Sequence, residues 1–321
     1  MIGLHSGPVS PETHVAPEET VRMWWLGQAG FLIRTGVSTI VIDPYLSNSL
    51  AVKYAGKQFP HTRLMPVPVD PRTLTDVTVV LCTHGHTDHI DPGSLPEIAQ
   101  ASPNARFLVP RSVTDIAVQR GAPGARTIGL DAGDHLDLKE AEAAGVSARS
   151  LDGLRVRAVP AAHERLDKDS HGRHLYLGYV FSLHGITFYH SGDTVPFAGQ
   201  VNLLRDLHID VALLPINGRD PYRRDRGVPG NMTGAEAVEL ADQIGAQFLV
   251  CHHWGMFDFN TADPHSLPAR QVGKVVVPEI GVSHDWTRDS RRHEPRPRSR
   301  QTLSPPYRPP TAPSLPSVGD S

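Results

Sequence analysis

The pattern of hydrophobic and polar positions predicts short strands alternating with helices over most of the chain. Between Val21 and Leu46, three runs of β-branched, aromatic and aliphatic residues are separated by glycine-containing turns, which is typical of consecutive strands. Further strand-like apolar runs are 76–84, 105–110, 154–163, 177–194, 211–216 and 247–251. Strands in both halves of the chain with helices between them predict a layered α/β domain.

Two segments carry helix signals. Residues 94–102 read as a short helix after the strand that ends near Cys82. The clearest helix begins at Thr233, whose hydroxyl can cap it, and Glu236 stands three positions later as in a capping box. Gly245 is placed to end this helix before the next strand.

The composition divides the chain into three parts. Residues 1–19 are rich in proline and glycine and predict a flexible arm, and residues 20–288 form the expected folded domain. Residues 289–321 contain mainly proline, arginine and serine, with six arginines against three carboxylates. Such a segment has too few apolar residues to offset the entropy of ordering, so we expect it to be disordered.

Charge and composition exclude several classes of protein. No apolar stretch is long enough to span a bilayer, and no secretory signal is recognisable, so we expect neither a membrane protein nor a membrane partner. The net charge of −3 gives no electrostatic reason to expect nucleic acid. Cys82 and Cys251 are the only cysteines, and both follow apolar runs, which favours buried thiols in a reducing cytoplasm over a disulfide.

Histidines and aspartates gather where four of the predicted strands end. They are His84, His86, Asp88 and His89 after the first strand, His163 after the second, Asp193 after the third, and His252 and His253 after the fourth. If the strands are neighbours, these side chains converge at one edge of the sheets. Imidazole and carboxylate ligands suit Zn, Mn or Fe, and five histidines, counting one of the adjacent His252 and His253, with two aspartates exceed the needs of one tetrahedral ion. The set predicts two ions that share a carboxylate.

The spacing His84-x-His86-x-Asp88-His89 resembles the signature of the metallo-β-lactamase superfamily. The stretches "VIDPYLS", "PAAHE", "YHSGDT", "LLPINGRD", "GNMTGAEAVELA" and "CHHWGMFDFN" resemble the branch that contains the L-ascorbate-6-phosphate lactonases. These matches run in order from about residue 22 to residue 260. The resemblance implies an αββα four-layer sandwich, in which two mixed β-sheets lie face to face with helices outside.

The resemblance also implies a ligand set for two divalent metal ions. His84, His86 and His163 would hold one ion, Asp88, His89 and His253 would hold the other, and Asp193 would bridge them. His253 fits better than His252 because the ligand of the family precedes an aromatic residue. Family members often carry Asp where this chain has Gly255, which puts contacts to the substrate in question and leaves the ligands intact.

Such a centre predicts a hydrolase. Two cations about 3.5–4 Å apart lower the pKa of a bridging water, and one of them polarises the oxygen under attack. Asp88 or Asp193 can orient the resulting hydroxide and relay a proton to the leaving group. Asp43, in "VIDPYL", is a candidate partner for a ligand histidine. Arg219 and Asn217 follow another strand and are candidates to bind an anionic group of a small substrate.

Three functions are compatible with the predicted fold and metal ligands. The first is opening of a small lactone or ester, with a phosphorylated sugar lactone as one option. The second is phosphodiester cleavage on the same scaffold, and the third is metal binding without catalysis, which the intact ligand set disfavours. The sequence does not distinguish a monomer from a homo-oligomer.

We expect deletion of Ser290 to Ser321 to leave the melting temperature and the activity nearly unchanged, because this composition cannot contribute to a core. Thermal unfolding of the full-length and shortened proteins measures the effect. A drop of many degrees would show that the segment docks on the body of the protein.

Overall fold

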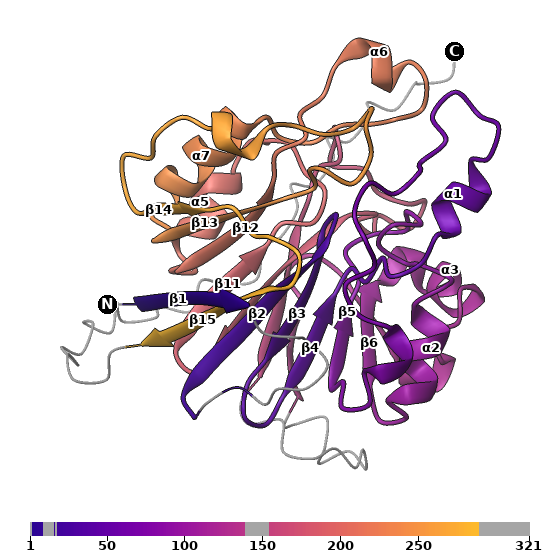
Figure 1. The fold of residues 1–321 in the computed structure, drawn as a ribbon, viewed down its shortest axis with the longest axis horizontal. Helices are drawn as coiled ribbons and strands as arrows, with labels where there is room; N and C mark the ends of the chain where they lie inside the picture. The colour runs from indigo at the N-terminus through magenta and orange to yellow at the C-terminus, as the bar shows by residue number, and fades with distance from the viewer. Residues whose placement is uncertain (1, 9–15, 17, 139–153, 289–321) are drawn as a thin grey trace, which may run out of the picture. The chain divides into compact units, whose positions relative to one another are not determined.

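The computed structural model describes residues 2–8, 16, 18–138 and 154–288, and it confirms the predicted α/β class (Figure 1). The strands are β1 (Ile2–Pro8), β2 (Thr20–Gly27), β3 (Gly30–Arg34), β4 (Thr39–Ile42), β5 (Val79–Leu81), β6 (Arg106–Pro110), β7 (Thr127–Leu130), β8 (His135–Asp137), β9 (Arg155–Pro160), β10 (Leu177–Leu183), β11 (Ile186–His190), β12 (Val211–Pro215), β13 (Phe248–His252), β14 (Lys274–Val276) and β15 (Val282–Arg288). The α-helices are α1 (Ser49–Lys53), α2 (Leu95–Ala101), α3 (Thr114–Gln119), α5 (Gln200–Arg205), α6 (Pro221–Arg224) and α7 (Gly234–Gln243). Single 3-10 turns are Pro71–Thr73, Arg111–Val113, Gly124–Arg126 and Pro264–Ser266.

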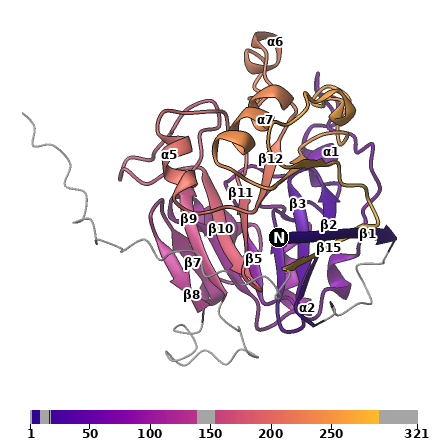
Figure 2. The ribbon, with the colours of Figure 1, turned by 90° about the vertical axis from the view of Figure 1, so that its left-hand side faces the viewer.

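The strands form two mixed sheets. The eight-stranded sheet has the order β1-β15-β2-β3-β4-β5-β6-β7, and the seven-stranded sheet has the order β14-β13-β12-β11-β10-β9-β8. Figure 2 shows the two sheets next to each other, with α5 and α7 beside the seven-stranded sheet. In each sheet one half is antiparallel and the other half is parallel. This is the arrangement that the predicted αββα sandwich requires.

Three apolar clusters hold the layers together. The largest contains residues of both sheets, including Phe31, Leu81, Phe188 and Trp286. A second cluster packs the outer face of the eight-stranded sheet against α2 and α3, and a third packs the seven-stranded sheet against α5 and α7. The central strands β3, β4, β12 and β13 are buried along their whole length, because both faces of each sheet are covered, and their sequences are therefore nearly continuous hydrophobic runs.

The two predicted helices are confirmed. In α2, the side chains of Leu95, Ile98 and Ala99 are buried. At the start of α7, the Thr233 hydroxyl accepts from the backbone of Glu236, and the Glu236 carboxylate accepts from the backbone of Thr233. This reciprocal pair satisfies two amides that would otherwise lack partners in the first turn.

The prediction of a flexible arm over residues 1–19 is wrong for Ile2–Pro8. These residues form β1, which pairs antiparallel with β15 along its whole length, and Ile2 is buried. The sequence of Ile2–Pro8 has no strand-like hydrophobic pattern, and the strand forms only because β15, at the other end of the domain, pairs with it. Most of residues 9–17 and all of the predicted tail 289–321 lie outside the described residues. Within the described ranges, no helix has the length and apolar character that a bilayer span requires.

We expect Trp286→Ala to lower the free energy of unfolding by about 3–5 kcal/mol, because it empties a large buried site between the sheets. Trp286 is 0% exposed and meets the rings of Phe248 and Phe188 edge-on, with centroid distances of 5.0 and 6.2 Å. Urea unfolding followed by circular dichroism measures the change. Val272→Ala, at a residue that is 53% exposed, is the control and should stay within about 0.5 kcal/mol. Equal small losses would contradict the packing described here.

Candidate metal centre

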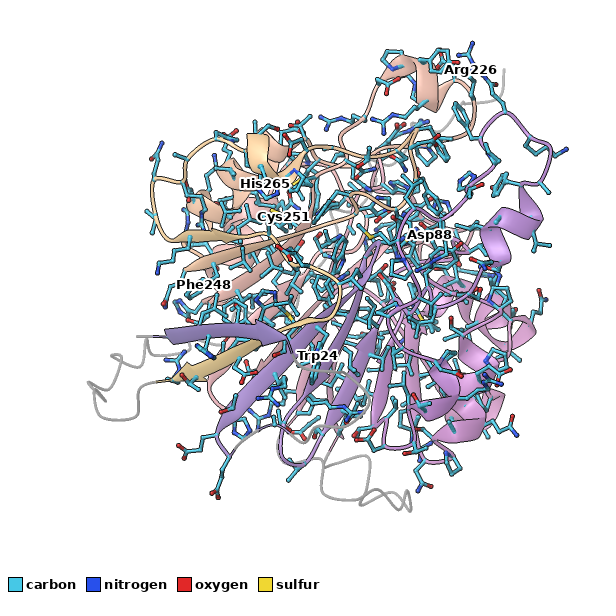
Figure 3. The ribbon with its side chains drawn as sticks, viewed as in Figure 1. Trp24, Asp88, Arg226, Phe248, Cys251 and His265 are labelled. Carbon is cyan, nitrogen blue, oxygen red and sulfur yellow. The ribbon has the colours of Figure 1, made fainter. Side chains whose placement is uncertain are left out.

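The predicted ligand residues follow the carboxyl ends of strands at one edge of the two sheets. Asp43 follows β4, and the run from His84 to His89 follows β5, which pairs parallel with β4. In the other sheet, His163 follows β9, Asp193 follows β11 and His253 follows β13. Because β11 and β13 both run parallel to β12, and β9 runs in the same direction through β10, their ends lie on the same side. Figure 3 shows Asp88 at this end of the strands, far from Trp24 within the eight-stranded sheet.

All seven predicted ligands lie in two adjoining groups, and within each group the ligand atoms are within 4.8 Å of one another. The first group is His84, His86, His163 and Asp193, and the second is Asp88, His89 and His253. His252, the alternative to His253, belongs to neither group and stacks on His190 with a centroid distance of 4.8 Å.

Asp193 faces both groups. Its Oδ2 lies 3.7 Å from Nε2 of His163 in the first group and 3.2 Å from Nε2 of His253 in the second. Its Oδ1 lies 3.5 Å from Nε2 of His89, also in the second group. One carboxylate therefore stands between the two sets of imidazoles, which is the position that a bridging ligand needs.

Asp43 forms a hydrogen bond with Nδ1 of His89, the ring nitrogen that does not face the other predicted ligands. Its Oδ2 lies 2.8 Å from Nδ1 of His89 and accepts from the Thr83 hydroxyl at 2.7 Å, and its Oδ1 accepts from the Thr83 amide at 2.8 Å. The carboxylate is fully buried, and its oxygens act as acceptors. Nδ1 of His89 therefore donates to it, and Nε2 of the same ring remains free to bind a metal. The predicted partnership of Asp43 with a ligand histidine therefore matches the contacts of this side chain.

Three further contacts orient His163, Asp88 and His253 among the predicted ligands. Nδ1 of His163 lies 3.1 Å from the carbonyl oxygen of Gly230. A Cβ on Gly230 would come within 2.5 Å of the Arg219 backbone, so the close approach of this loop requires glycine. The amide of Gln28 donates to Oδ2 of Asp88 at 2.8 Å and lies 3.1 Å from Nε2 of His253. Gln28 was not predictable from the sequence, since it belongs to a turn with no metal-binding motif.

Several residues around the centre adopt left-handed backbone conformations that non-glycine residues rarely take. Gln28, Asp43 and His253 have φ values of 52°, 42° and 60°. Each such residue costs of order 1–3 kcal/mol and persists only where the surrounding structure holds it. These three residues contact one another or other predicted ligands, so the strained backbone conformations occur where side chains of the candidate metal centre are positioned.

Burial and charge shift the pKa values of the ligands in opposite directions. Burial lowers the pKa of His163 to about 4, and burial with the neighbouring histidines lowers the pKa of His84 well below its usual value. Burial alone would lower the pKa of His89, but the carboxylates around it, Asp193 first, raise it well above its usual value. Burial alone would raise the pKa of Asp193, but His253 and His89 hold it well below its usual range. The site therefore concentrates negative charge and stabilises a cation.

The donor atoms that face the centre fit a metal. Nε2 of His84, Nε2 of His89 and Oδ1 of Asp193 are buried and have no hydrogen-bond partner among the described residues. Orphaned buried nitrogen and oxygen atoms are costly unless something else satisfies them. Neutral imidazoles and ionised carboxylates are the protonation states that coordinate transition metals. The residues present therefore fit a His/Asp metal centre.

A cavity of about 100 Å³ opens onto this centre. Asp88, whose side chain is 15% exposed, lies in its wall together with His86, His163 and Asp193. Part of the lining comes from residues that the sequence analysis did not propose, namely Lys53, Tyr54, His61, Val228 and Asn260. The positions of these residues relative to the ligands are set by tertiary structure, and no local pattern marks them.

The structure places Arg219 and Asn217 outside the lining of that cavity. The Arg219 guanidinium pairs with both carboxylate oxygens of Glu236 at 2.6 Å and lines a separate, more open cavity. Asn217 is buried and donates to Oδ1 of Asn260 at 2.7 Å. It therefore orients Asn260, which lines the cavity, without lining the cavity itself. Their binding of an anionic substrate group stays a prediction.

Gly255, which replaces the aspartate common in the related branch, has a φ of 68°. Its amide donates to the Thr261 hydroxyl at 2.7 Å. A Cβ at this position would lie 2.5 Å from the end of the Met65 side chain. The glycine therefore shapes the loop after His253 and offers no side chain to the centre.

Comparison with known proteins gives the class of this architecture. The family model of the β-lactamase superfamily domain matches residues 38–254, which span β4 to the loop after β13 and contain all seven predicted ligand positions. The chain belongs to the metallo-β-lactamase superfamily and is a metal-dependent hydrolase.

Curated relatives are distant. The chain is 27% identical over 274 residues to a probable L-ascorbate-6-phosphate lactonase UlaG of Escherichia fergusonii, covering 80% of this chain and 75% of the relative. It is 30% identical over 270 residues to a metal-dependent hydrolase of Myxococcus xanthus, covering 81% of each chain. These matches confirm the resemblance inferred from the motifs.

Solved structures support the fold. A metallo hydrolase from the archaeon Ignicoccus hospitalis aligns with a TM-score of 0.57 at 24% identity, over 83% of this chain and 98% of that chain. An isothiocyanate hydrolase from Delia radicum gut bacteria aligns with a TM-score of 0.55 at 20% identity, over 75% and 88% of the two chains. At these identities the likeness shows a shared fold and leaves the substrate open.

We expect Asp43→Asn to raise the dissociation constant for metal about 10- to 100-fold, because asparagine has one acceptor oxygen where Asp43 uses two, so either His89 or the Thr83 amide faces an NH2 group. Competition with a chelator of known affinity measures this constant without recourse to activity. The exposed Asp206→Asn variant is the control. An unchanged affinity in the Asp43 variant would show that His89 is oriented by other contacts.

Proposed function

We propose that this hydrolase opens a small lactone or ester with two divalent metal ions. The observation that carries the proposal is the position of Asp193, whose carboxylate faces imidazoles of both ligand groups. The seven ligands would divide into the first group around one ion and the second group around the other, with Asp193 shared. Zn or Mn suits this mixture of imidazole and carboxylate ligands, and Fe suits it as well.

The metal ions, when bound, supply an activated water near neutral pH and an electrophilic contact for the oxygen under attack. The residues of the chain fix where that chemistry takes place. Asp43 and the Gly230 carbonyl hold His89 and His163 in one ring orientation each. The imidazoles therefore do not reorganise during the reaction, which is the condition under which electrostatic stabilisation is strong.

Asp88 is the group best placed to move a proton. Burial alone would raise its pKa, but His89 and His253 hold it below its usual value, so the carboxylate is ionised and accepts a proton. The Gln28 amide donates to one of its oxygens and fixes its orientation. In hydrolysis of an ester, Asp88 takes a proton from the attacking water and returns it to the leaving alkoxide oxygen.

The size of the cavity supports a small substrate. About 100 Å³ is far below the usual 300–1,000 Å³ of a site that encloses a drug-sized ligand. A lactone ring or a short ester can present its carbonyl group in such a space. The relatives named as L-ascorbate-6-phosphate lactonases favour a lactone over a phosphodiester, and the phosphodiester is the alternative that the experiment below tests.

A cytoplasmic location is part of the proposal. Its support is the state of Cys82 and Cys251, which are both free and buried. Burial raises the pKa of Cys251 to about 12, so this thiol is unreactive and has no part in the chemistry.

We expect about two metal ions per chain and loss of hydrolysis after treatment with a chelator, because the ligand set exceeds the needs of one ion. His86→Ala should abolish turnover of a lactone, since it removes a ligand of the first group. Elemental analysis of the purified protein, together with assays on a panel of lactones and a generic phosphodiester, measures both points.

Cys251→Ala is the matched control, since it alters a buried residue two positions before the predicted ligand His253 and should leave the metal in place. Full activity with only a trace of bound metal would refute the two-metal proposal. Turnover of the phosphodiester with no turnover of any lactone would keep the metal centre and replace the substrate class.

A further inference from the structure

The wall of the metal-site cavity contains a positive charge with no carboxylate partner. Lys53, at the end of α1, is the only lysine or arginine among the described residues that line this cavity. The carboxylates in the same lining are Asp88 and Asp193, and both belong to the candidate metal ligands. Within the described part of the chain, Lys53 forms no ion pair.

Two contacts hold the Lys53 ammonium at the cavity. Its Nζ donates to the Thr87 hydroxyl at 3.1 Å, and Thr87 lies between the ligands His86 and Asp88 in the sequence. The ammonium also lies 5.2 Å from the centroid of the Tyr54 ring, within the range of a cation–π contact. A lysine ammonium has three donors, so the bond to Thr87 leaves donors for a further acceptor.

The other basic candidate is already engaged. Both terminal nitrogens of Arg219 donate to the Glu236 carboxylate, and one of them also donates to the Asn231 carbonyl at 3.1 Å. Glu236 in turn completes the capping box of α7. A substrate anion at Arg219 would have to compete with this pair, whereas an anion at Lys53 meets an unpaired charge.

The cavity also offers an aromatic wall next to this charge. His61 stacks on Tyr54 with a centroid distance of 4.2 Å, and its Nδ1 lies 2.6 Å from the Phe59 carbonyl oxygen, so this nitrogen carries the proton. Burial lowers the pKa of His61, so the ring is neutral. The Tyr54 ring therefore contacts both the His61 ring and the Lys53 ammonium in the lining of this cavity.

We propose that Lys53 binds an oxyanion of the substrate, a phosphate or a carboxylate, beside the ester or lactone group that reacts at the metal centre. This inference rests on the proposed function and specifies its substrate class. Lys53 is itself solvent-exposed, and its hydrogen bond to the Thr87 hydroxyl places the ammonium beside the metal-binding loop, where an anion in the cavity can reach it. The substrate is therefore a small anionic ester or lactone, and a neutral analogue lacks the contact.

The test compares Lys53→Met with the native protein on a phosphorylated lactone, a carboxylate-bearing lactone and a neutral lactone of the same ring. Methionine keeps the length of the side chain and removes its charge. We expect KM to rise at least about tenfold for the anionic lactone that fits and to change less than about twofold for the neutral one, with kcat retained. The arm that shows the larger rise identifies phosphate or carboxylate as the group that is bound.

Two controls separate charge at the cavity from charge in general. Lys57→Met removes an exposed lysine four residues away that does not line the cavity, and it should change none of these constants. Lys53→Arg keeps the charge and should retain much of the preference for the anionic substrate. Metal content should equal that of the native protein in all three variants.

A binding measurement keeps this inference distinct from the proposed function. Calorimetric titration of the metal-loaded protein with inorganic phosphate should give a dissociation constant about tenfold higher for Lys53→Met than for Lys57→Met. If no lactone is hydrolysed by the native protein, the proposed function fails, and the phosphate titration still decides the role of Lys53. Equal phosphate affinities in the two variants, or equal losses on charged and neutral lactones, would overturn the inference.

Discussion

The candidate metal centre depends on one constraint, namely that strands of two different sheets end at the same edge. Parallel pairing of β4 with β5 brings Asp43 beside the loop from His84 to His89, and parallel pairing across β11, β12 and β13 does the same for Asp193 and His253. The Tyr179 hydroxyl of the seven-stranded sheet donates to the Cys82 carbonyl at 2.8 Å and ties the two edges together. Without this alignment, the histidines would be isolated side chains at the ends of unrelated strands.

The same edge gathers buried negative charge. Asp43, Asp88 and Asp193 lie within a few ångströms of His89, and their combined effect favours a positive charge at its ring. A buried carboxylate is tolerated where its oxygens are hydrogen-bonded, and Asp43 meets this condition through Thr83 and His89. Asp193 leaves one oxygen without such a partner, which is where the arrangement departs from ordinary packing.

The sequence was sufficient for the features that arise from local chemistry. The helix after Thr233 was predictable because its capping residues lie within four positions, and the ligand motif was recognisable because four of its members lie between His84 and His89. The strands β1 and β15 were not predictable, since Ile2 pairs with Arg288 and neither segment shows which partner it has. Lys53 and His61 were missed for the same reason: only the packing of α1 and its loop against the metal-binding loop brings them to the cavity.

The division of the predicted ligands between the two sheets would tie the folding equilibrium to the metal supply. His84 and His86 come from one sheet, whereas His163 and Asp193, in the same ligand group, come from the other. An ion bound by such a group holds the native state and has no comparable site in the unfolded chain, so free metal at 100 times its dissociation constant adds about 2.7 kcal/mol to the free energy of unfolding. The folded population of this protein would then depend on metal availability, so scarcity of metal would lower the free energy of unfolding in addition to removing turnover.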